Sequence, residues 1–303
     1  LQGAKLTLSR NVANSAFQLA MLNEQLKTTK AIIQAQKELV NIAQKQHLLG
    51  GINQIDVNTI KNSLSQEQIN ITNIQKNREA TLNQLAVYLG KNPSEISVPD
   101  LTLNAFSTVR DIPLVVPSRL VHQRPDILAS EALLHQASAE VGLATANMYP
   151  DINLTGSVGR IATQNTWQKI NGQSWVWTVG PGIDLPIFHG GSLTAEKKAA
   201  IAAFNVALAN YKQTVLQALQ NVADCLTALD LDDKNLTEQS AIYQKTHANY
   251  VTTRQQYYLG GASLQQLLNA QIEENQALIA LLQAKSLKLS DTVALFQAIG
   301  GQW

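Results

Sequence analysis

The chain has 303 residues, with 23 Lys and Arg against 22 Asp and Glu, so its net charge is only +1. This balance provides no basic field for nucleic acid. The five histidines and the single cysteine are scattered without metal-ligand spacing, and no phosphate loop, nucleophile elbow or dinucleotide fingerprint occurs. We therefore expect neither an enzyme nor a cofactor.

The first 91 residues recur along the chain at a constant offset of 210 residues. The Leu-Gly-Gly of residues 49–51 returns at 259–261, and Gly90 returns as Gly300. A register that is kept without insertions indicates long elements of fixed length. The sequence predicts two helical hairpins, residues 1–90 and 191–300, each made of long antiparallel helices.

A hydrophobic residue recurs every seven positions in the second hairpin, which indicates supercoiled helices packed on neighbours. The row consists of Val215, Val222, Leu229, Leu236, Tyr243, Tyr250 and Tyr257. At ~1.5 Å per residue, the helix predicted over 191–259 is ~100 Å long. No apolar run is long enough for a membrane-spanning helix.

Between the hairpins, residues 91–124 are rich in proline and predict an irregular belt with a short strand-like run at 112–116. A helix is expected over 125–150, because Pro125 suits a first helical position and Asp126 suits a first turn.

Residues 151–188 contain two runs of alternating polar and apolar residues, which predict a β-hairpin with one apolar face. Trp167, Trp175 and Trp177 are aromatics of the kind that gathers at a membrane interface. Such a hairpin cannot satisfy its own strand edges, so copies from other units would have to close it into a barrel. Pro181 lacks the N–H that would donate to the neighbouring strand. The alternative, a hairpin that caps a soluble helical bundle, therefore stays open.

Several motifs carry a resemblance to a known family. They are P-S-R-L at 117–120, Q-R-P-D-I at 123–127, Y-P-D-I-N-L at 149–154, D-L-P-I-F at 184–188 and the two L-G-G turns. With the duplicated hairpins and the Pro-rich belt, the chain resembles the TolC-like outer-membrane efflux ducts, most closely their NodT-like lipoprotein branch.

The resemblance implies a mainly α fold with a β-hairpin, in which three protomers build a helical tunnel (α-barrel) across the periplasm and a β-barrel in the outer membrane of a Gram-negative bacterium. It implies a passive exit duct for small molecules. The partners would be two further copies, a periplasmic adaptor, an inner-membrane RND-type transporter and outer-membrane lipid. The alternative is a soluble coiled-coil scaffold, and the sequence does not name the cargo.

The offset also predicts that the first repeat begins about 120 residues before Leu1, since each repeat unit is 210 residues long. We therefore expect an amino-terminally truncated chain, without the first barrel hairpin. A trimer of the present chain would have six strands, too few for an open pore.

The resemblance finally implies three sets of functional residues. The helix reversals, where glycine adopts the backbone angles that other residues avoid, are expected to dock the adaptor. A ring of polar contacts would close the tunnel, with Asp56 carrying charge that the amide of Asn269 lacks. The sets are Gly50, Gly51, Asn53, Gly260, Gly261 and Ser263 for docking, Asp56 and Asn269 for the gate, and Trp167, Trp175 and Trp177 for the membrane girdle.

Overall fold

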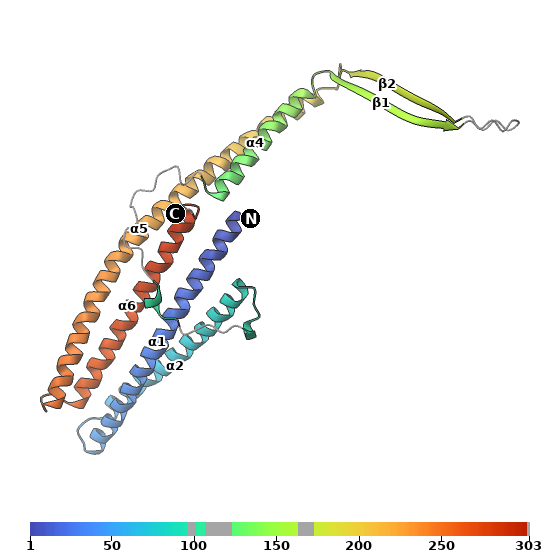
Figure 1. Ribbon diagram of the computed structural model, residues 1–303. Helices are drawn as coiled ribbons and strands as arrows, with labels where there is room; N and C mark the ends of the chain where they lie inside the picture. Colours follow the sequence, from blue (N-terminus) through green and yellow to red (C-terminus); the bar gives the residue numbers. More distant parts are fainter. Residues whose placement is uncertain (96–100, 107–122, 163–172, 302–303) are drawn as a thin grey trace. The chain divides into compact units, whose positions relative to one another are not determined.

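The computed structural model describes residues 1–95, 101–106, 123–162 and 173–301. Its elements, shown in Figure 1, are α1 (Gln2–Leu48), α2 (Gln54–Tyr88), the 3-10 turns η1 (Pro93–Glu95) and η2 (Leu103–Ala105), α4 (Pro125–Ala146), β1 (Asp151–Ala162), β2 (Gln173–Asp184), α5 (Ser192–Tyr258) and α6 (Leu264–Ala298). The prediction of a mainly helical fold with one β-hairpin is confirmed. The strand-like run expected at 112–116 lies outside the described residues.

The chain forms two compact units. The first consists of Leu1–Pro125 with Gln217–Trp303, and the second consists of Asp126–Leu216. The first unit therefore holds α1, α2, α6 and the carboxyl-terminal part of α5. The second holds α4, the hairpin and the amino-terminal part of α5.

In the first unit, α1 packs between α2 and α6 (Figure 1). On the far side of α6, polar bridges join it to α5: Lys288 bonds Asp233, and His247 Nδ1 lies 2.6 Å from Glu274 Oε1. The order across the unit is therefore α2, α1, α6, α5. Each repeat contributes one inner helix and one outer helix.

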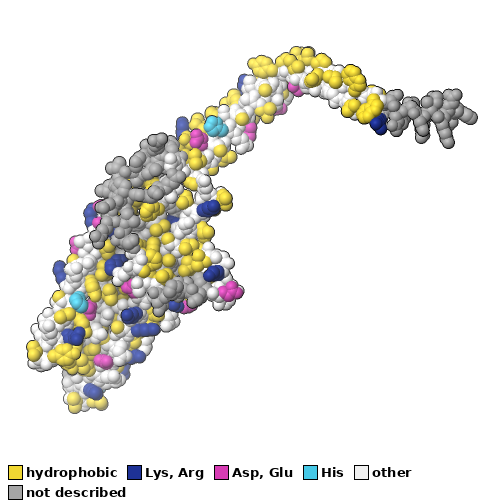
Figure 2. Space-filling model, viewed as in Figure 1, with side chains coloured by type: hydrophobic (Ala, Val, Ile, Leu, Met, Phe, Trp, Pro, Cys, Tyr) yellow, Lys and Arg dark blue, Asp and Glu magenta, His cyan; other side chains and the backbone are white. Residues whose placement is uncertain are grey.

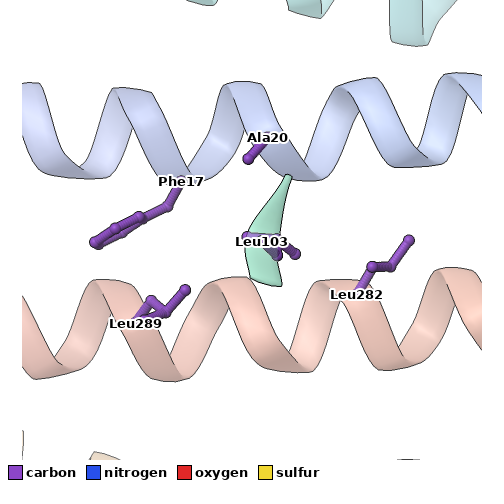
Figure 3. Close-up of a cluster of buried hydrophobic side chains, with 5 residues drawn as sticks. All are labelled: Phe17, Ala20, Leu103, Leu282 and Leu289. Carbon is purple, nitrogen blue, oxygen red and sulfur yellow. The ribbon is translucent and has the colours of Figure 1, made fainter. Parts of the chain in front are cut away.

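A hydrophobic cluster fixes the contact between the two repeats (Figure 3). It consists of Phe17 and Ala20 of α1, Leu282 and Leu289 of α6, and Leu103 of η2. The Leu103 N–H donates to Glu24 Oε1 at 2.7 Å, which holds η2 against α1. This described part of the belt is thus packed into the core between the inner helices.

The predicted seven-residue row forms the less exposed side of α5. Val222 and Leu229 are buried, while Val215, Leu236, Tyr243, Tyr250 and Tyr257 are half-buried. The rest of α5 is mostly exposed, with four buried residues among 67, against 14 among the 47 residues of α1. The outer helices therefore have a single packed face, whereas α1 is packed on two sides.

The hairpin of the second unit pairs β1 and β2 in antiparallel register, from Asp151 opposite Asp184 to Ala162 opposite Gln173. Pro181 stands opposite Leu154, and β2 continues through it. Of the described helices, none combines the length and apolar character needed to cross a lipid bilayer.

Candidate functional site

The first candidate site is the pair of helix reversals, which we call the tips: residues 48–53 between α1 and α2, and residues 258–263 between α5 and α6. The two tips repeat each other to the level of single backbone hydrogen bonds. These run from Leu49 to Lys45 (3.2 Å), Gly50 to His47 (2.9 Å) and Gly51 to Gln46 (2.8 Å), and from Leu259 to Gln255 (3.1 Å), Gly260 to Tyr257 (3.1 Å) and Gly261 to Gln256 (2.8 Å).

Only the first glycine of each tip needs a left-handed backbone. Gly50 has φ of 75° and Gly260 has φ of 77°, whereas Gly51 and Gly261 are outside this region. Left-handed angles are thus observed at the first glycine of each pair and not at the second. At Gly51 space favours glycine instead, because an added Cβ would lie 3.3 Å from the carbonyl oxygen of Gln46.

Asn53 and Ser263 are helix N-caps. Asn53 Oδ1 accepts from the Asp56 N–H at 2.8 Å, and Ser263 Oγ accepts from the Gln266 N–H at 3.2 Å. Gln266 Oε1 in turn accepts from the Ser263 N–H at 2.7 Å, completing a capping box. These side-chain oxygens therefore already serve the helix ends.

The two residues expected at the gate, Asp56 and Asn269, are not brought together within one chain. Both are exposed. Asp56 lies in the first turn of α2, where the helix dipole favours its negative charge. Asn269 lies on α6, on the other side of α1. Within the described residues no hydrogen bond joins them.

Sequence reasoning missed the most exposed feature of the tips. Leu49 and Leu259 are each 87% exposed, and Leu48 and Tyr258 beside them are exposed as well. The residue that commonly makes an apolar contact with the last turn is the one after the left-handed glycine, and in the two tips this residue is Gly51 or Gly261. Here both repeats instead present apolar side chains at the same place, and the Leu-Gly-Gly repeat was the signal that could have revealed this.

The second candidate site is the hairpin, where the predicted alternation is observed. Figure 2 shows apolar side chains along it. One face carries Ile152, Leu154 and Val158 of β1 with Trp175, Trp177, Val179, Pro181 and Ile183 of β2. Trp175 and Trp177 are exposed, and the Arg160 guanidinium lies 4.3 Å from the centre of the Trp175 ring. Trp167 lies outside the described residues.

The opposite face of the hairpin is polar or small from Asp151 to Gly159 of β1, and on β2 it also carries Val176. Ser157 Oγ and Thr178 Oγ1 lie 3.0 Å apart in a hydrogen bond, and Thr155 Oγ1 donates to the Gly180 carbonyl at 3.2 Å. The sheet has two strands, so each strand has one edge without a neighbour in the described part of the chain. The hairpin thus has an apolar face, a polar face and two open edges.

Comparison with known proteins bears on these features. The family model described as "Outer membrane efflux protein" matches residues 1–91 and 116–301. The toluene efflux pump outer membrane protein TtgC of Pseudomonas putida is 28% identical over 303 residues, which are 100% of this chain and 62% of that protein. The chain therefore spans about 62% of the length of this relative.

Solved structures agree with this family. The outer membrane protein VceC of Vibrio cholerae has a TM-score of 0.80 at 26% identity, covering 99% of this chain and 71% of that one. The open state of the MtrE outer membrane channel of Neisseria gonorrhoeae has a TM-score of 0.83 at 26% identity, covering 99% and 67%. The resemblance expected from the motifs is confirmed: the chain belongs to the outer membrane efflux protein family.

Proposed function

We propose that this protein is the outer-membrane channel of a tripartite efflux pump and acts as a passive exit duct. The observation that carries the proposal is the likeness, over 99% of this chain, to the outer membrane protein VceC and to the outer membrane channel MtrE. The chain supplies walls rather than chemistry in this function. Its cargo would be small molecules, of a kind set by the partner transporter.

The exposure of the outer helices supports assembly from several copies. α2 buries five residues of 35 and α5 four of 67, whereas the inner α6 buries ten of 35. The outer helices therefore form two unpaired borders of a four-helix layer. Joining the α2 border of one copy to the α5 border of the next would close a ring, and three copies would give a helical tunnel.

The hairpin fits a segment of a membrane barrel. Each strand has 12 residues, and a tilted strand needs ~9–11 to cross a bilayer. The apolar face would meet lipid, with Trp175 and Trp177 in the girdle, and the face with Ser157 and Thr178 would line the lumen. Both edges must be paired, because an unsatisfied backbone group in lipid costs several kcal/mol. Neighbouring strands from the assembled protein would do this.

The tips are the proposed docking site for a periplasmic adaptor, which would link the duct to an inner-membrane RND-type transporter. The exposed Leu49 and Leu259 give the adaptor two equivalent apolar contacts, with Asn53 and Ser263 ordering the backbone beside them. Asp56 and Asn269 are proposed to close the tunnel near this end. The boundaries 1–90, 91–124, 125–150, 151–188 and 191–300 stand as the proposed division into tunnel, belt, helix, barrel and tunnel segments.

The experiment is export of a fluorescent dye by a Gram-negative strain without its own outer-membrane channel, supplied with the gene of this protein and its cognate adaptor and transporter. We expect dye retention to fall, the protein to fractionate with the outer membrane, and chemical cross-linking to give trimers. A protein released by buffer without detergent, and no effect on dye, would overturn the proposal in favour of the scaffold.

Docking is tested by Leu49→Ser with Leu259→Ser. Both side chains are exposed, so the trimer should survive while export is lost. The control outside the tips is Asp230→Asn, because Asp230 is an exposed residue of α5 that pairs with Lys234; we expect it to retain export. Unchanged export in the double Leu variant would overturn docking through these side chains.

A further inference from the structure

The offset of 210 residues brings four positions of the α1–α2 contact into correspondence with four of the α5–α6 contact, and their chemistry differs. In the first repeat Arg78 Nε donates to Asn23 Oδ1 at 2.7 Å, and at the equivalent positions Lys288 bonds Asp233. The bridge between inner and outer helix is therefore present in both repeats. Next to it, Leu22 and Thr81 of the first repeat become Asp232 and Asp291 in the second.

The first repeat is neutral at this place. Leu22 and Thr81 are both buried, and the Thr81 hydroxyl donates to the Asn77 carbonyl at 2.8 Å. This pair buries no charge. The Thr81 hydroxyl has a hydrogen-bond partner, and the Leu22 side chain has no polar atom that would need one. The first repeat thus provides an internal reference for the second.

In the second repeat Asp232 is only 7% exposed, and its Oδ2 has no hydrogen-bond partner among the described residues. The nearby Lys288 bonds the carboxylate of Asp233 through its Nζ, not that of Asp232. Asp291 follows Lys288 by three residues and so lies on the same face of α6. A buried carboxylate without a donor is costly, whereas a protonated carboxyl can donate to the carboxylate facing it.

The electrostatic surroundings of Asp232 favour its protonated form. Burial, then hydrogen bonding with Asp291 and its charge, raise the pKa of Asp232 to about 6, while Lys288 opposes the rise. Asp291 and Lys288 of α6 are the charged groups that act on Asp232, and Asp233 is its neighbour on α5. The sign follows: above about 6 the ionised carboxyl destabilises the folded contact, and acidification from 6 towards the ordinary 3.8 relieves this.

We propose that Asp232 and Asp291 form a proton-binding site that couples the strength of the α5–α6 contact to pH. Under mild acid one proton is held between the two carboxyls, and α5 and α6 pack more firmly. At neutral pH two negative charges face each other and the contact loosens. Since α5 and α6 end in a tip, pH would then bias the position of that tip. Any effect of this bias on docking rests on the proposed function.

The test is hydrogen–deuterium exchange of the full-length protein in detergent at about pH 5 and about pH 7.5, corrected for the intrinsic pH dependence of exchange. Peptides covering 225–240 and 284–298 report on the α5–α6 contact. From a pKa of about 6 against 3.8, we expect the equilibrium for opening this contact to be about tenfold smaller at the lower pH. Peptides covering 15–30 and 74–88 of the first repeat should not share this change.

Variants make the assignment specific. Asp232→Asn resembles the protonated acid, so its α5–α6 peptides should be protected at both pH values, and Asp291→Thr, which restores the first-repeat residue, should also abolish the pH dependence. Asp230→Asn is the matched control, because Asp230 is exposed and pairs with Lys234; it should behave as wild type. The proposal is overturned if the wild-type α5–α6 peptides lack the pH dependence, if the first repeat shares it, or if Asp232→Asn retains it. Dye export plays no part in the readout, so failure here and failure of the duct are distinguishable.

Discussion

The two helical hairpins of this protein share the same backbone turns and helix caps at their tips, but they differ in which residues are buried along their helices. At the ends, the glycine turns and the N-caps recur at the offset of 210 residues. Local chemistry determines these features, because a reversal needs a left-handed residue and a helix start needs a cap wherever it occurs. Duplication has therefore preserved them.

Along the sides, equivalent positions have different neighbours. Phe17 of α1 is buried against α6, whereas its counterpart Thr227 of α5 is exposed. Leu289 of α6 is buried, and its counterpart Glu79 of α2 is exposed. The inner helices meet each other and the outer helices do not, so tertiary position rather than repeat position decides which residues are apolar. This asymmetry predicts where substitution will matter.

The largest expected effect is at the contact between the repeats. Phe17→Ala removes a buried ring that packs 4.9 Å, centre to centre, from Phe106, and should lower the free energy of unfolding by about 3–5 kcal/mol. Thr227→Ala, at the equivalent exposed position, should change it by no more than about 0.5 kcal/mol. Thermal or denaturant unfolding of the full-length protein measures both, and equal effects would contradict the distinction between inner and outer helices.

The tips should respond equally in the two repeats, because their backbones match. Gly50→Ala and Gly260→Ala each place a side chain at positive φ and should cost about 1–2 kcal/mol. Gly261→Ala is the matched control: its φ is not left-handed, and the nearest atom to the new Cβ would be 3.6 Å away. We expect that variant to unfold like wild type. A cost at Gly261 as large as that at Gly260 would show that space, not backbone angle, governs the turn.

The caps should have a smaller effect. Asn53→Ala and Ser263→Ala each leave a helix N–H without its side-chain acceptor, at a cost of about 1 kcal/mol. Gln266→Ala removes only the reciprocal half of the capping box and should cost less than Ser263→Ala. Unfolding measurements on the three variants test this order, which a larger loss in Gln266→Ala would reverse.

The sequence was sufficient for the helices and the turns. The helix expected over 191–259 is observed as Ser192–Tyr258, because the seven-residue row and the paired glycines are local signals. The hairpin was equally clear, since alternation at Ile152, Leu154 and Val158 has a period of two. In both cases the information lies within a few neighbouring residues.

The sequence was insufficient where exposure depends on distant residues. Asp232 and Asp233 are adjacent, yet one is buried and the other is exposed, because only Asp232 shares the face of α5 that carries the buried Leu229 three residues earlier. Leu49 is apolar and so would be expected in the core, but its side chain is exposed in the described part of the chain. The proposed assembly and the proposed docking both depend on exposed surfaces of this kind, and no local pattern encodes which residues form them.

The smallest effect, and the one that best separates the hairpins, concerns the shared bridge. Lys288→Met should change stability by no more than about 1 kcal/mol, because its partner Asp233 is largely exposed. It should nevertheless move the midpoint of the α5–α6 pH dependence upward from about 6, since Lys288 lowers the pKa of Asp232 and its removal leaves the raising influences of burial and Asp291 unopposed. Arg78→Met in the first repeat breaks the equivalent bridge beside Leu22, which does not titrate, and so should cause no pH-dependent change. Exchange measured across a pH series in the two variants gives the answer, and a downward shift in Lys288→Met, or a shift of the first repeat in Arg78→Met, would contradict the assigned electrostatics.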